Sequence, residues 1–269
     1  MSTLRPDQIA DLARRHDHAR RTATPISAPT LERPDMDLDD AYAVQEAWMA
    51  LEVANGKRVV GHKIGLTSQA MQQQMQIGEP DFGVLLDDMV FEDGCDLPTS
   101  RFIDPRIEVE VAFVLGRRLE GPNVTMIDVL SATDYVVPAL ELIDARSHRV
   151  DPATKRARTV RDTIADNAAD AGIITGGRPM RPLDVDLRWV GAILARNGIV
   201  EETGLAAGVL NHPANGVAWL VRRYAPLGRA LEPGQVVLGG SFTRAVIARP
   251  GDTFAVDFGP LGTVSCHFS

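Results

Sequence analysis

The stretch "RIEVEVAFVL", residues 106 to 115, alternates between apolar residues and a second set that begins with two glutamates. Side chains on a β-strand point alternately to its two faces, so this alternation predicts a strand with one wholly apolar face. That face comprises Ile107, Val109, Val111, Phe113 and Leu115. The opposite face carries Glu108, Glu110, Ala112 and Val114. The strand is therefore expected to anchor in a core on one side and to present two carboxylates on the other.

Glu108 and Glu110 are expected to stand ~6.5 to 7 Å apart along the strand, close enough to converge on a single cation. Two carboxylates that face a protein interior are costly unless a positive charge compensates them. A strand at a solvent-facing edge would remove that cost, and the strand pattern alone leaves this alternative open. Glu141 adds a third carboxylate within another short apolar run, "ALELI", residues 139 to 143.

Three oxygen ligands without histidine or cysteine favour a hard cation, Mg²⁺ or Mn²⁺, over zinc. Such a cation keeps coordination positions open for water and a substrate. A 2-oxo acid suits these positions because its carboxylate and adjacent keto oxygen can chelate a metal. The metal would then stabilise the enolate that forms when a proton leaves C3. The carboxylates thus indicate a small-molecule 2-oxo acid as the substrate class.

Lys63, in "GHKIGLTSQAM", is one of three lysines in a chain of 269 residues. A desolvated lysine can exchange a proton near neutral pH, unlike arginine, but a surface lysine before a loop would have no such role. Asp81, which follows a proline, is typical of a turn. The segment "GGSFT", residues 239 to 243, could bring backbone N–H groups and the Ser241 or Thr243 hydroxyl near an anionic substrate. The alternative for that segment is a strand end softened by glycines.

The segment from residue 144 to residue 170 fits neither a helix nor a strand pattern and carries few large apolar groups. A long charged loop in a compact domain is either a mobile surface segment or a lid over a site, and the sequence leaves both open. Its basic residues and histidine are Arg146, His148, Arg149, Lys155, Arg156, Arg158 and Arg161. Arg146, or an arginine between residues 149 and 161, could hold a distal carboxylate of the substrate.

The order of helical and strand patterns predicts an α+β fold around a mixed sheet. Residues 1–60 are expected to form a helical region packed on the main body, with helices near residues 6 to 21 and 36 to 55 and a proline-rich connector between them. Residues 61–269 are expected to form the metal-binding catalytic domain. Asn197-Gly198 between two apolar runs predicts a β-hairpin, and helices are predicted at "TMIDVLSATDYV" and "HPANGVAWLVRRYA".

Composition excludes several classes of function. Acidic residues outnumber basic ones 36 to 28, and no basic stripe is interleaved with aromatics, so nucleic acid is not an expected partner. No apolar stretch reaches the ~18 to 20 residues that span a bilayer, and the N-terminus lacks the apolar segment of a secretory signal. Cys95 and Cys266 lie far apart in sequence, which suits a reducing compartment and makes the cytoplasm the expected location.

Several stretches together resemble the hydratase and decarboxylase branch of the fumarylacetoacetate hydrolase superfamily, over essentially the whole chain. They are "GHKIGLTSQAMQQQMQIGEPDFGVLLDDM", "RFIDPRIEVEVAFVL", "ATDYVVPALELIDAR", "DTIADNAADAG" and "AAGVLNHPANGVAWL". The resemblance implies a mixed β-roll core with surrounding helices, a Mg²⁺ or Mn²⁺ site, and a closed homo-oligomer, possibly a decamer built as a pentamer of dimers. Further stretches, "LEGPNVT", "ELIDARSH" and "GGSFTR", favour the hydratases that act on an unsaturated 2-oxo dicarboxylic acid.

The resemblance also implies roles for individual residues. The family's E-x-E motif and its distant glutamate fall on Glu108, Glu110 and Glu141, which would hold the metal. The active-site lysine falls on Lys63 and the acidic residue of the P-D-[FY]-G turn on Asp81, which replaces the surface and turn interpretations of both. The chain lacks an obvious counterpart of the N-terminal histidine arrangement of the carbon–carbon hydrolases, which argues against hydrolysis. A metal-binding subunit without activity is an alternative that this complete residue set disfavours.

Overall fold

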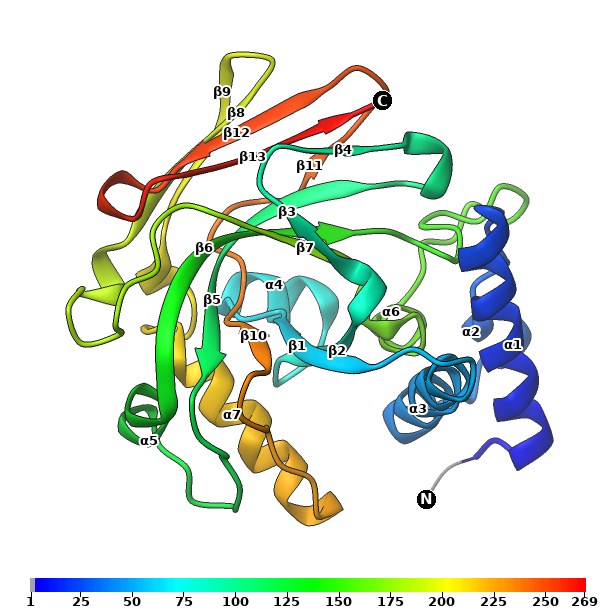
Figure 1. Ribbon diagram of the computed structural model, residues 1–269. Helices are drawn as coiled ribbons and strands as arrows, with labels where there is room; N and C mark the ends of the chain where they lie inside the picture. The colour runs from blue at the N-terminus through cyan, green and yellow to red at the C-terminus, as the bar shows by residue number, and fades with distance from the viewer. Residues whose placement is uncertain (1–2) are drawn as a thin grey trace.

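Two β-sheets form the body of the protein in a computed structural model that describes residues 3 to 269 (Figure 1). The larger sheet has the strand order β2-β1-β10-β5-β6-β7-β3, with β11 also pairing with β5. Its strands are β1 (Val59–Gly65), β2 (Asp81–Leu86), β3 (Val90–Glu92), β5 (Arg106–Leu115), β6 (Thr133–Ile143), β7 (Asp170–Thr175), β10 (Val236–Leu238) and β11 (Val246–Ile247). The smaller sheet, ordered β4-β13-β12-β8-β9, comprises β4 (Cys95–Leu97), β8 (Gly191–Arg196), β9 (Ile199–Leu205), β12 (Thr253–Asp257) and β13 (Thr263–Phe268).

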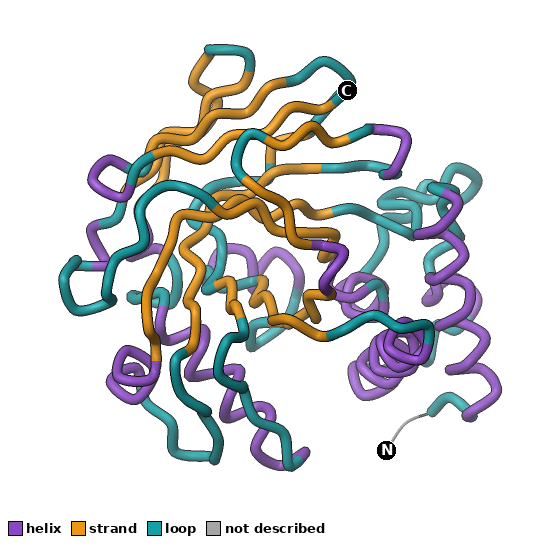
Figure 2. The backbone as a smooth tube through the Cα atoms, in the orientation of Figure 1, coloured by secondary structure: helices purple, strands orange, loops and turns teal. Residues whose placement is uncertain are grey.

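The helices gather beside and below the strands (Figure 2). They are α1 (Pro6–Thr22), α2 (Pro29–Glu32), α3 (Leu38–Ala54), α4 (Gln69–Met75), α5 (Met126–Ala132), α6 (Val160–Ala165) and α7 (Ala214–Tyr224). Helix α7 packs on the outer face of the larger sheet, where its buried side chains join the same apolar cluster as Ile64 of β1. The sheet itself curls until β2, at one end, contacts β7 and the 3-10 turn η3 (Asn167–Ala169) near the other end. The predicted α+β fold with a curled mixed sheet is confirmed.

Strand β5 matches the predicted strand and explains why its glutamates are inside. It pairs with β10 and β11 on one side and with β6 on the other, so the solvent-facing edge is the wrong alternative. The whole predicted apolar face, from Ile107 to Leu115, belongs to the main hydrophobic cluster. On the opposite face, Glu110 is completely buried and Glu108 is half-buried. The sheet therefore presents carboxylates to its own concave side.

The N-terminal helices lie where the sequence predicts them. Helix α3 begins at the capping residue Asp37, whose carboxylate accepts the N–H of Asp40, and ends before Gly56, which has a φ of +94°. The connector contains the single turn α2. Leu12 and Val44 share a hydrophobic cluster with Val109 of β5. A domain boundary at residue 60 stays a prediction.

The predicted hairpin and the two helices predicted after residue 120 are present, one helix with a shorter extent than predicted. Asn197 and Gly198, with φ of 54° and 79°, form the turn between β8 and β9, since both central residues of such a turn need positive φ. Helix α7 lies within the second predicted stretch and buries the side chains of Val217, Leu220, Val221 and Tyr224. Helix α5 ends at Ala132, and the following "TDYV" already belongs to β6, because that segment pairs with β5 instead of continuing the helix.

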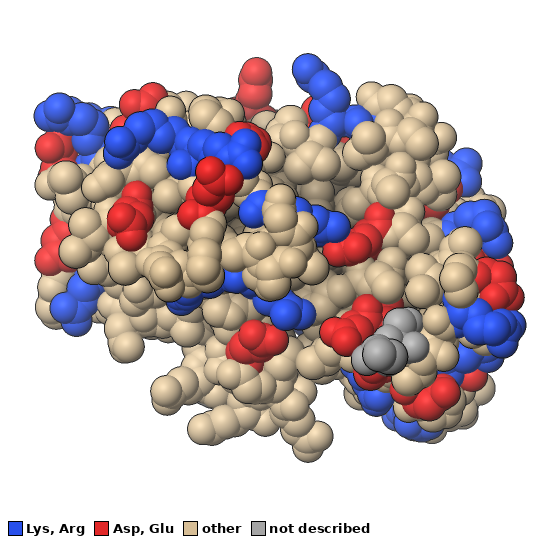
Figure 3. Space-filling model, turned by 90° about the horizontal axis from the view of Figure 1, so that it is seen from below, with Lys and Arg blue, Asp and Glu red and all other residues tan. Residues whose placement is uncertain are grey.

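The charged segment from residue 144 to residue 170 is not a continuous loop. It includes helix α6, whose capping residue Thr159 and third residue Asp162 form a capping box, and the turn η3. Two of its arginines are tied to the body: Arg149 pairs with Asp104, and Arg161 donates to the carbonyl of Met36. Basic and acidic side chains alternate on the face shown in Figure 3. Within residues 3–269, no helix is long and apolar enough to cross a membrane.

Candidate functional site

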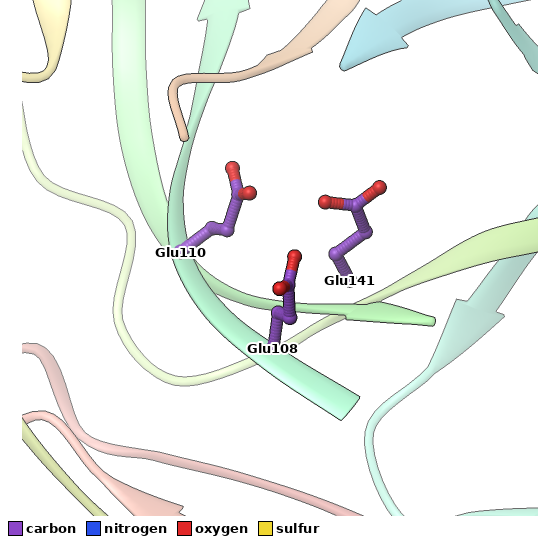
Figure 4. A group of neighbouring side chains, drawn as sticks. All are labelled: Glu108, Glu110 and Glu141. Carbon is purple, nitrogen blue, oxygen red and sulfur yellow. The ribbon is translucent and has the colours of Figure 1, made fainter. Parts of the chain in front are cut away.

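Three glutamate carboxylates meet on the concave face of the larger sheet (Figure 4). Glu108 of β5 lies directly opposite Glu141 of β6 in the antiparallel pair, and Glu110 follows two residues along the same face. Each residue offers one oxygen, and these oxygens all lie within 4.8 Å of one another. Oxygens bound to one Mg²⁺ or Ca²⁺, at about 2.0 to 2.6 Å from the ion, are separated by similar distances.

Three oxygens of this cluster lack a hydrogen-bond partner among the described residues. Oε1 of Glu110 and both oxygens of Glu141 have no hydrogen-bond partner among the described residues, although both residues are completely buried. Oε2 of Glu110 accepts the N–H of Gly240 at 2.8 Å. Buried carboxylates are normally paired or bound to metal, so the orphaned oxygens fit a divalent cation with an all-carboxylate ligand set.

Strand register places Lys63 and Asp81 on the same face as the glutamates. Residues that oppose each other in neighbouring strands share a face, and Lys63 opposes Leu238 of β10, which opposes Ala112 of β5. On the other side, Lys63 opposes Gly83 of β2, two residues from Asp81. All of these side chains therefore point into the concavity, and Lys63 and Asp81 are 4 % and 2 % exposed.

Lys63 lies among carboxylates. Its Nζ is 3.2 Å from Oε1 of Glu141, an ion-pair distance whose angles do not make it a hydrogen bond. A Cβ added to Gly65 would lie 2.2 Å from Oδ1 of Asp81 and 3.1 Å from Nζ of Lys63, so both groups crowd the space above this glycine. The absence of a side chain at Gly65 allows the lysine and the aspartate to approach each other.

Burial and mutual repulsion raise the pKa values of the carboxylates. Desolvation and then Glu141 raise the pKa of Glu108 to about 7, even though this residue keeps some exposure. The same two causes raise the pKa of Glu110 well above its usual range. Desolvation also raises the pKa of Asp81, against the opposing effect of Lys63. For Lys63, burial alone would lower the pKa, but Glu141, Asp81 and Glu108 outweigh it and raise the pKa.

The segment from residue 239 to residue 243 lies against β5 between the two glutamates. The Ser241 hydroxyl donates to the carbonyls of Val109 and Thr243, and Oγ1 of Thr243 accepts the N–H of Val109 at 3.3 Å. Both hydroxyls thus hold the strand that carries the ligands. A contact of either with substrate stays a prediction.

The arginines expected to hold a distal carboxylate are already paired. Arg146 is 2 % exposed, its Nε lies 2.6 Å from Oδ1 of Asp166, and its guanidinium stacks over Trp48. Arg158 also pairs with Asp166, at 3.1 Å, and lies close enough to lower the pKa of Asp81. Arg149 similarly opposes the rise in the pKa of Glu108. The substrate-binding role of Arg146 stays a prediction.

The sequence pattern did not single out Asp170, a further carboxylate near Lys63. It is 1 % exposed and stands at the start of β7. The only signal was its place in "DTIADNAADAG", one of the stretches that carry the family resemblance. Its position on the concave face depends on a local irregularity of the sheet that strand periodicity does not reveal.

The sequence is similar to several curated enzymes over nearly its full length. It is 61% identical over 257 residues to the 2-oxo-hept-4-ene-1,7-dioate hydratase of Escherichia coli. The aligned region covers 96% of this chain and 96% of the relative. It is 40% identical over 265 residues to the 2-keto-4-pentenoate hydratase of Paraburkholderia xenovorans (strain LB400), covering 98% of this chain and 96% of the relative. No protein-family model matches the chain.

The fold is similar to that of a solved enzyme. The 4-oxalocrotonate decarboxylase from Pseudomonas putida G7, complexed with magnesium and adipate, superposes with a TM-score of 0.94 at 36% identity, covering 100% of both chains. A second structure of that enzyme, complexed with calcium and acetate, has the same TM-score of 0.94. Both structures contain a divalent cation, which agrees with the carboxylate cluster described above.

Proposed function

The chain belongs to the hydratase and decarboxylase branch of the fumarylacetoacetate hydrolase superfamily, and on that basis we propose that it hydrates 2-oxohept-4-ene-1,7-dioate to 4-hydroxy-2-oxoheptane-1,7-dioate. The observation that carries the proposal is the convergence of three carboxylates and Lys63 on one sheet face, in a chain 61% identical to a hydratase of that substrate. The enzyme is thus a hydro-lyase that depends on a divalent cation. Its place would be in aromatic catabolism, on the homoprotocatechuate meta-cleavage route.

Glu108, Glu110 and Glu141 would hold the cation, which we propose to be Mg²⁺ or Mn²⁺. When bound, the cation would be chelated by the 2-oxo acid and would stabilise negative charge on the keto oxygen. Gly240 supports the site because its N–H holds one oxygen of Glu110 in place. The hydroxyls of Ser241 and Thr243 hold the intervening backbone of β5, and either could turn to an anionic substrate.

The chain's own residues must move protons at two carbon atoms, C3 and C5, and take one from the attacking water. The C4–C5 double bond of the substrate is not conjugated with the keto group, so water cannot add at C4 directly. Removal of a C3 proton gives a dienolate, and protonation at C5 gives the conjugated 3-enoate. Water then attacks C4, and C3 regains a proton. We assign these transfers jointly to Lys63 and Asp81, which crowd the same space above Gly65.

The distal carboxylate of the substrate needs a positive partner. Arg146 remains our candidate, together with the arginines between residues 149 and 161. Arg158 and Arg149 are supported as candidates because Arg158 lowers the pKa of Asp81 and Arg149 lowers that of Glu108, each against larger effects that raise it. Binding of substrate to Arg146, Arg149 or Arg158 would compete with the aspartates that pair with these arginines now.

We also propose that the enzyme is a closed homo-oligomer, a decamer formed as a pentamer of dimers. Exposed apolar side chains on the hairpin β8–β9 and beside it are available for such contacts. They include Trp189, Ile193, Ile199 and Val200. Sedimentation velocity of the purified protein tests the assembly, and a monomer at micromolar concentration would contradict it.

A substrate comparison tests the proposed reaction. Purified protein with Mg²⁺ is incubated separately with 2-oxohept-4-ene-1,7-dioate, 2-oxopent-4-enoate and 4-oxalocrotonate, while ultraviolet absorbance and CO₂ release are followed. The proposal expects the highest kcat/KM with the seven-carbon diacid and no CO₂. Preference for 2-oxopent-4-enoate would indicate a hydratase without selection for the distal carboxylate. CO₂ release from 4-oxalocrotonate would indicate a decarboxylase, the activity of the superposed enzyme.

A further inference from the structure

Asp170 is a buried carboxylate that forms no hydrogen bond with the described part of the chain. Neither of its oxygens has a hydrogen-bond partner among the described residues, although the residue is only 1 % exposed. Desolvation and then Glu141 raise the pKa of the Asp170 carboxyl well above its usual range, against the opposing effects of Lys63, Arg146 and the backbone N–H of Gly172. A buried carboxylate kept in this state destabilises the fold, so its presence requires a reason outside folding stability.

A β-bulge turns Asp170 toward the glutamates. In the pairing of β6 with β7, Leu142 opposes Gly172 but the next residue, Ile143, opposes Asp170, so β7 has one extra residue at this point. Ile143 lies two residues from Glu141 and therefore shares its face. Without the extra residue, Ala171 would oppose Ile143 and Asp170 would point to the other face of the sheet.

The backbone before Asp170 is strained. Asn167, Ala168 and Ala169 have φ of 52°, 51° and 62°, a run of left-handed conformations that non-glycine residues rarely adopt. The Asn167 side chain holds this turn by accepting the N–H of Val84 at 2.8 Å and donating to its carbonyl at 2.9 Å. Strain of this kind persists where the surrounding structure enforces it, commonly at functional sites.

The side chain of Asp170 lies beside Lys63. A Cβ added to Gly83 would be 3.1 Å from Cγ of Lys63 and 3.2 Å from Cβ of Asp170, so the two side chains are neighbours across this glycine. Asp170 also contributes to the raised pKa of Lys63. Lys63 is thus approached by Glu141 from β6, by Asp81 from β2 and by Asp170 from β7.

We propose that Asp170 is a positioning residue that orients the Lys63 ammonium for proton transfer when a cation occupies the glutamates. A cation would compete with Lys63 for Glu141, its ion-pair partner at 3.2 Å, and would repel the ammonium group. When ionised, Asp170 supplies an opposite charge that the cation does not share, so Lys63 keeps its place beside it. The inference rests on the proposed function only for the part that Lys63 takes in proton transfer.

The test compares Asp170→Asn, which keeps the shape and removes the charge, with wild type. Proton transfer is measured separately from hydration as the exchange of C3 hydrogens of 2-oxopentanoate for deuterium, by NMR in D₂O with Mg²⁺. In Asp170→Asn we expect the rate of exchange and kcat to fall 10- to 100-fold. KM and the Mg²⁺ affinity measured by calorimetry should change less than 3-fold, and the midpoint of thermal unfolding should not fall.

Asp252→Asn is the matched control, because its carboxylate accepts hydrogen bonds from Asn197 and Arg249 beside the smaller sheet. Its midpoint should fall while exchange stays unchanged.

Two outcomes would overturn the inference. Unchanged exchange in Asp170→Asn would show that Lys63 does not depend on this carboxylate, and a lower thermal midpoint with unchanged kcat would assign Asp170 a structural role. Asp170→Ala is measured in parallel, so that a folding defect of the asparagine variant does not decide the result. If wild type exchanges protons but does not hydrate the seven-carbon diacid, the proposed substrate is wrong while the role of Asp170 is still tested.

Discussion

Glu110 has two oxygens in contrasting situations. Oε2 accepts the N–H of Gly240, and Oε1 has no partner in the described part of the chain. Together with Glu108 and Glu141 it forms a cluster whose mutual repulsion destabilises the cation-free fold. A bound cation would turn this destabilisation into a stabilisation, because it attracts all three carboxylates. The same concentration of negative charge therefore destabilises the cation-free protein and creates the cation site.

Replacing one ligand should remove the cation site without unfolding the protein. In Glu108→Gln we expect the Mg²⁺ dissociation constant to rise at least ~100-fold and kcat to fall below ~1 % of wild type, because an amide lacks the charge that a hard cation requires. Titration calorimetry and steady-state kinetics measure the two effects. Glu120→Gln, at an exposed position where Glu120 pairs with Arg118, is the control. Full activity and affinity in Glu108→Gln would contradict the ligand assignment.

Cation binding should depend on pH, because the pKa of Glu108 is raised to about 7 in the cation-free protein and that of Glu110 is raised well above its usual range. At lower pH these carboxyls carry protons that the cation must displace. Mg²⁺ affinity is therefore expected to rise between about pH 6 and pH 8, with release of protons on binding. Calorimetry in buffers of different ionisation enthalpy counts the protons. Binding without proton release would show that the carboxylates are already ionised.

At the scale of elements, regular patterns could be predicted from the sequence and irregular ones could not. The alternation in β5 and the Asn197-Gly198 turn depend on neighbouring residues alone, and both predictions are confirmed. The bulge in β7 and the left-handed turn η3 depend on contacts with β6 and β2, which periodicity does not contain. For that reason Asp170 was missed, and the segment containing α6 was interpreted as a loop.

The clamp of Asn167 on β2 should contribute strongly to stability. Asn167→Ala leaves the N–H and the carbonyl of Val84 without this partner, so the free energy of unfolding is expected to fall by about 2 to 4 kcal/mol. Because the turn leads into Asp170, the exchange of C3 hydrogens should slow as well. Chemical denaturation measures the first effect. Asn215→Ala, which removes one hydrogen bond to Leu210, is the control and should cost about 1 kcal/mol. An equal loss of unfolding free energy in both variants would show that the two hydrogen bonds of Asn167 stabilise the fold no more than the single one of Asn215.

At the scale of the whole molecule, curling of the larger sheet assembles the site. Lys63 and Asp81 lie on β1 and β2 at one end of the strand order, whereas Glu141 and Asp170 lie on β6 and β7 toward the other. Contacts of β2 with β7 and η3 bring the two groups together. The proposed catalytic set thus spans 108 positions of the chain, from residue 63 to residue 170, and comes together only in the folded state.

Since the site exists only in the folded state, cation binding should stabilise the whole protein. At a Mg²⁺ concentration of about 100 times the dissociation constant, the gain is about 2.7 kcal/mol. For a chain of this size, that corresponds to a rise of roughly 5 to 10 °C in the thermal midpoint. Calorimetric scans with Mg²⁺ and with EDTA measure the shift. Glu108→Gln should show no shift, and an equal shift in that variant would place the stabilising cation elsewhere.

The sequence by itself determined the strand β5 with its two faces, the hairpin, the main helices and the identity of the three glutamates, because these follow from periodicity, turn chemistry and motif resemblance over short distances. Only the tertiary structure decided that β5 is central instead of an edge, that Lys63 pairs with Glu141, and that Asp170 joins them. These features depend on strand partners distant in the chain, on a one-residue bulge, and on the curl that brings β2 to β7. A pattern that repeats every two residues carries no information about such partners.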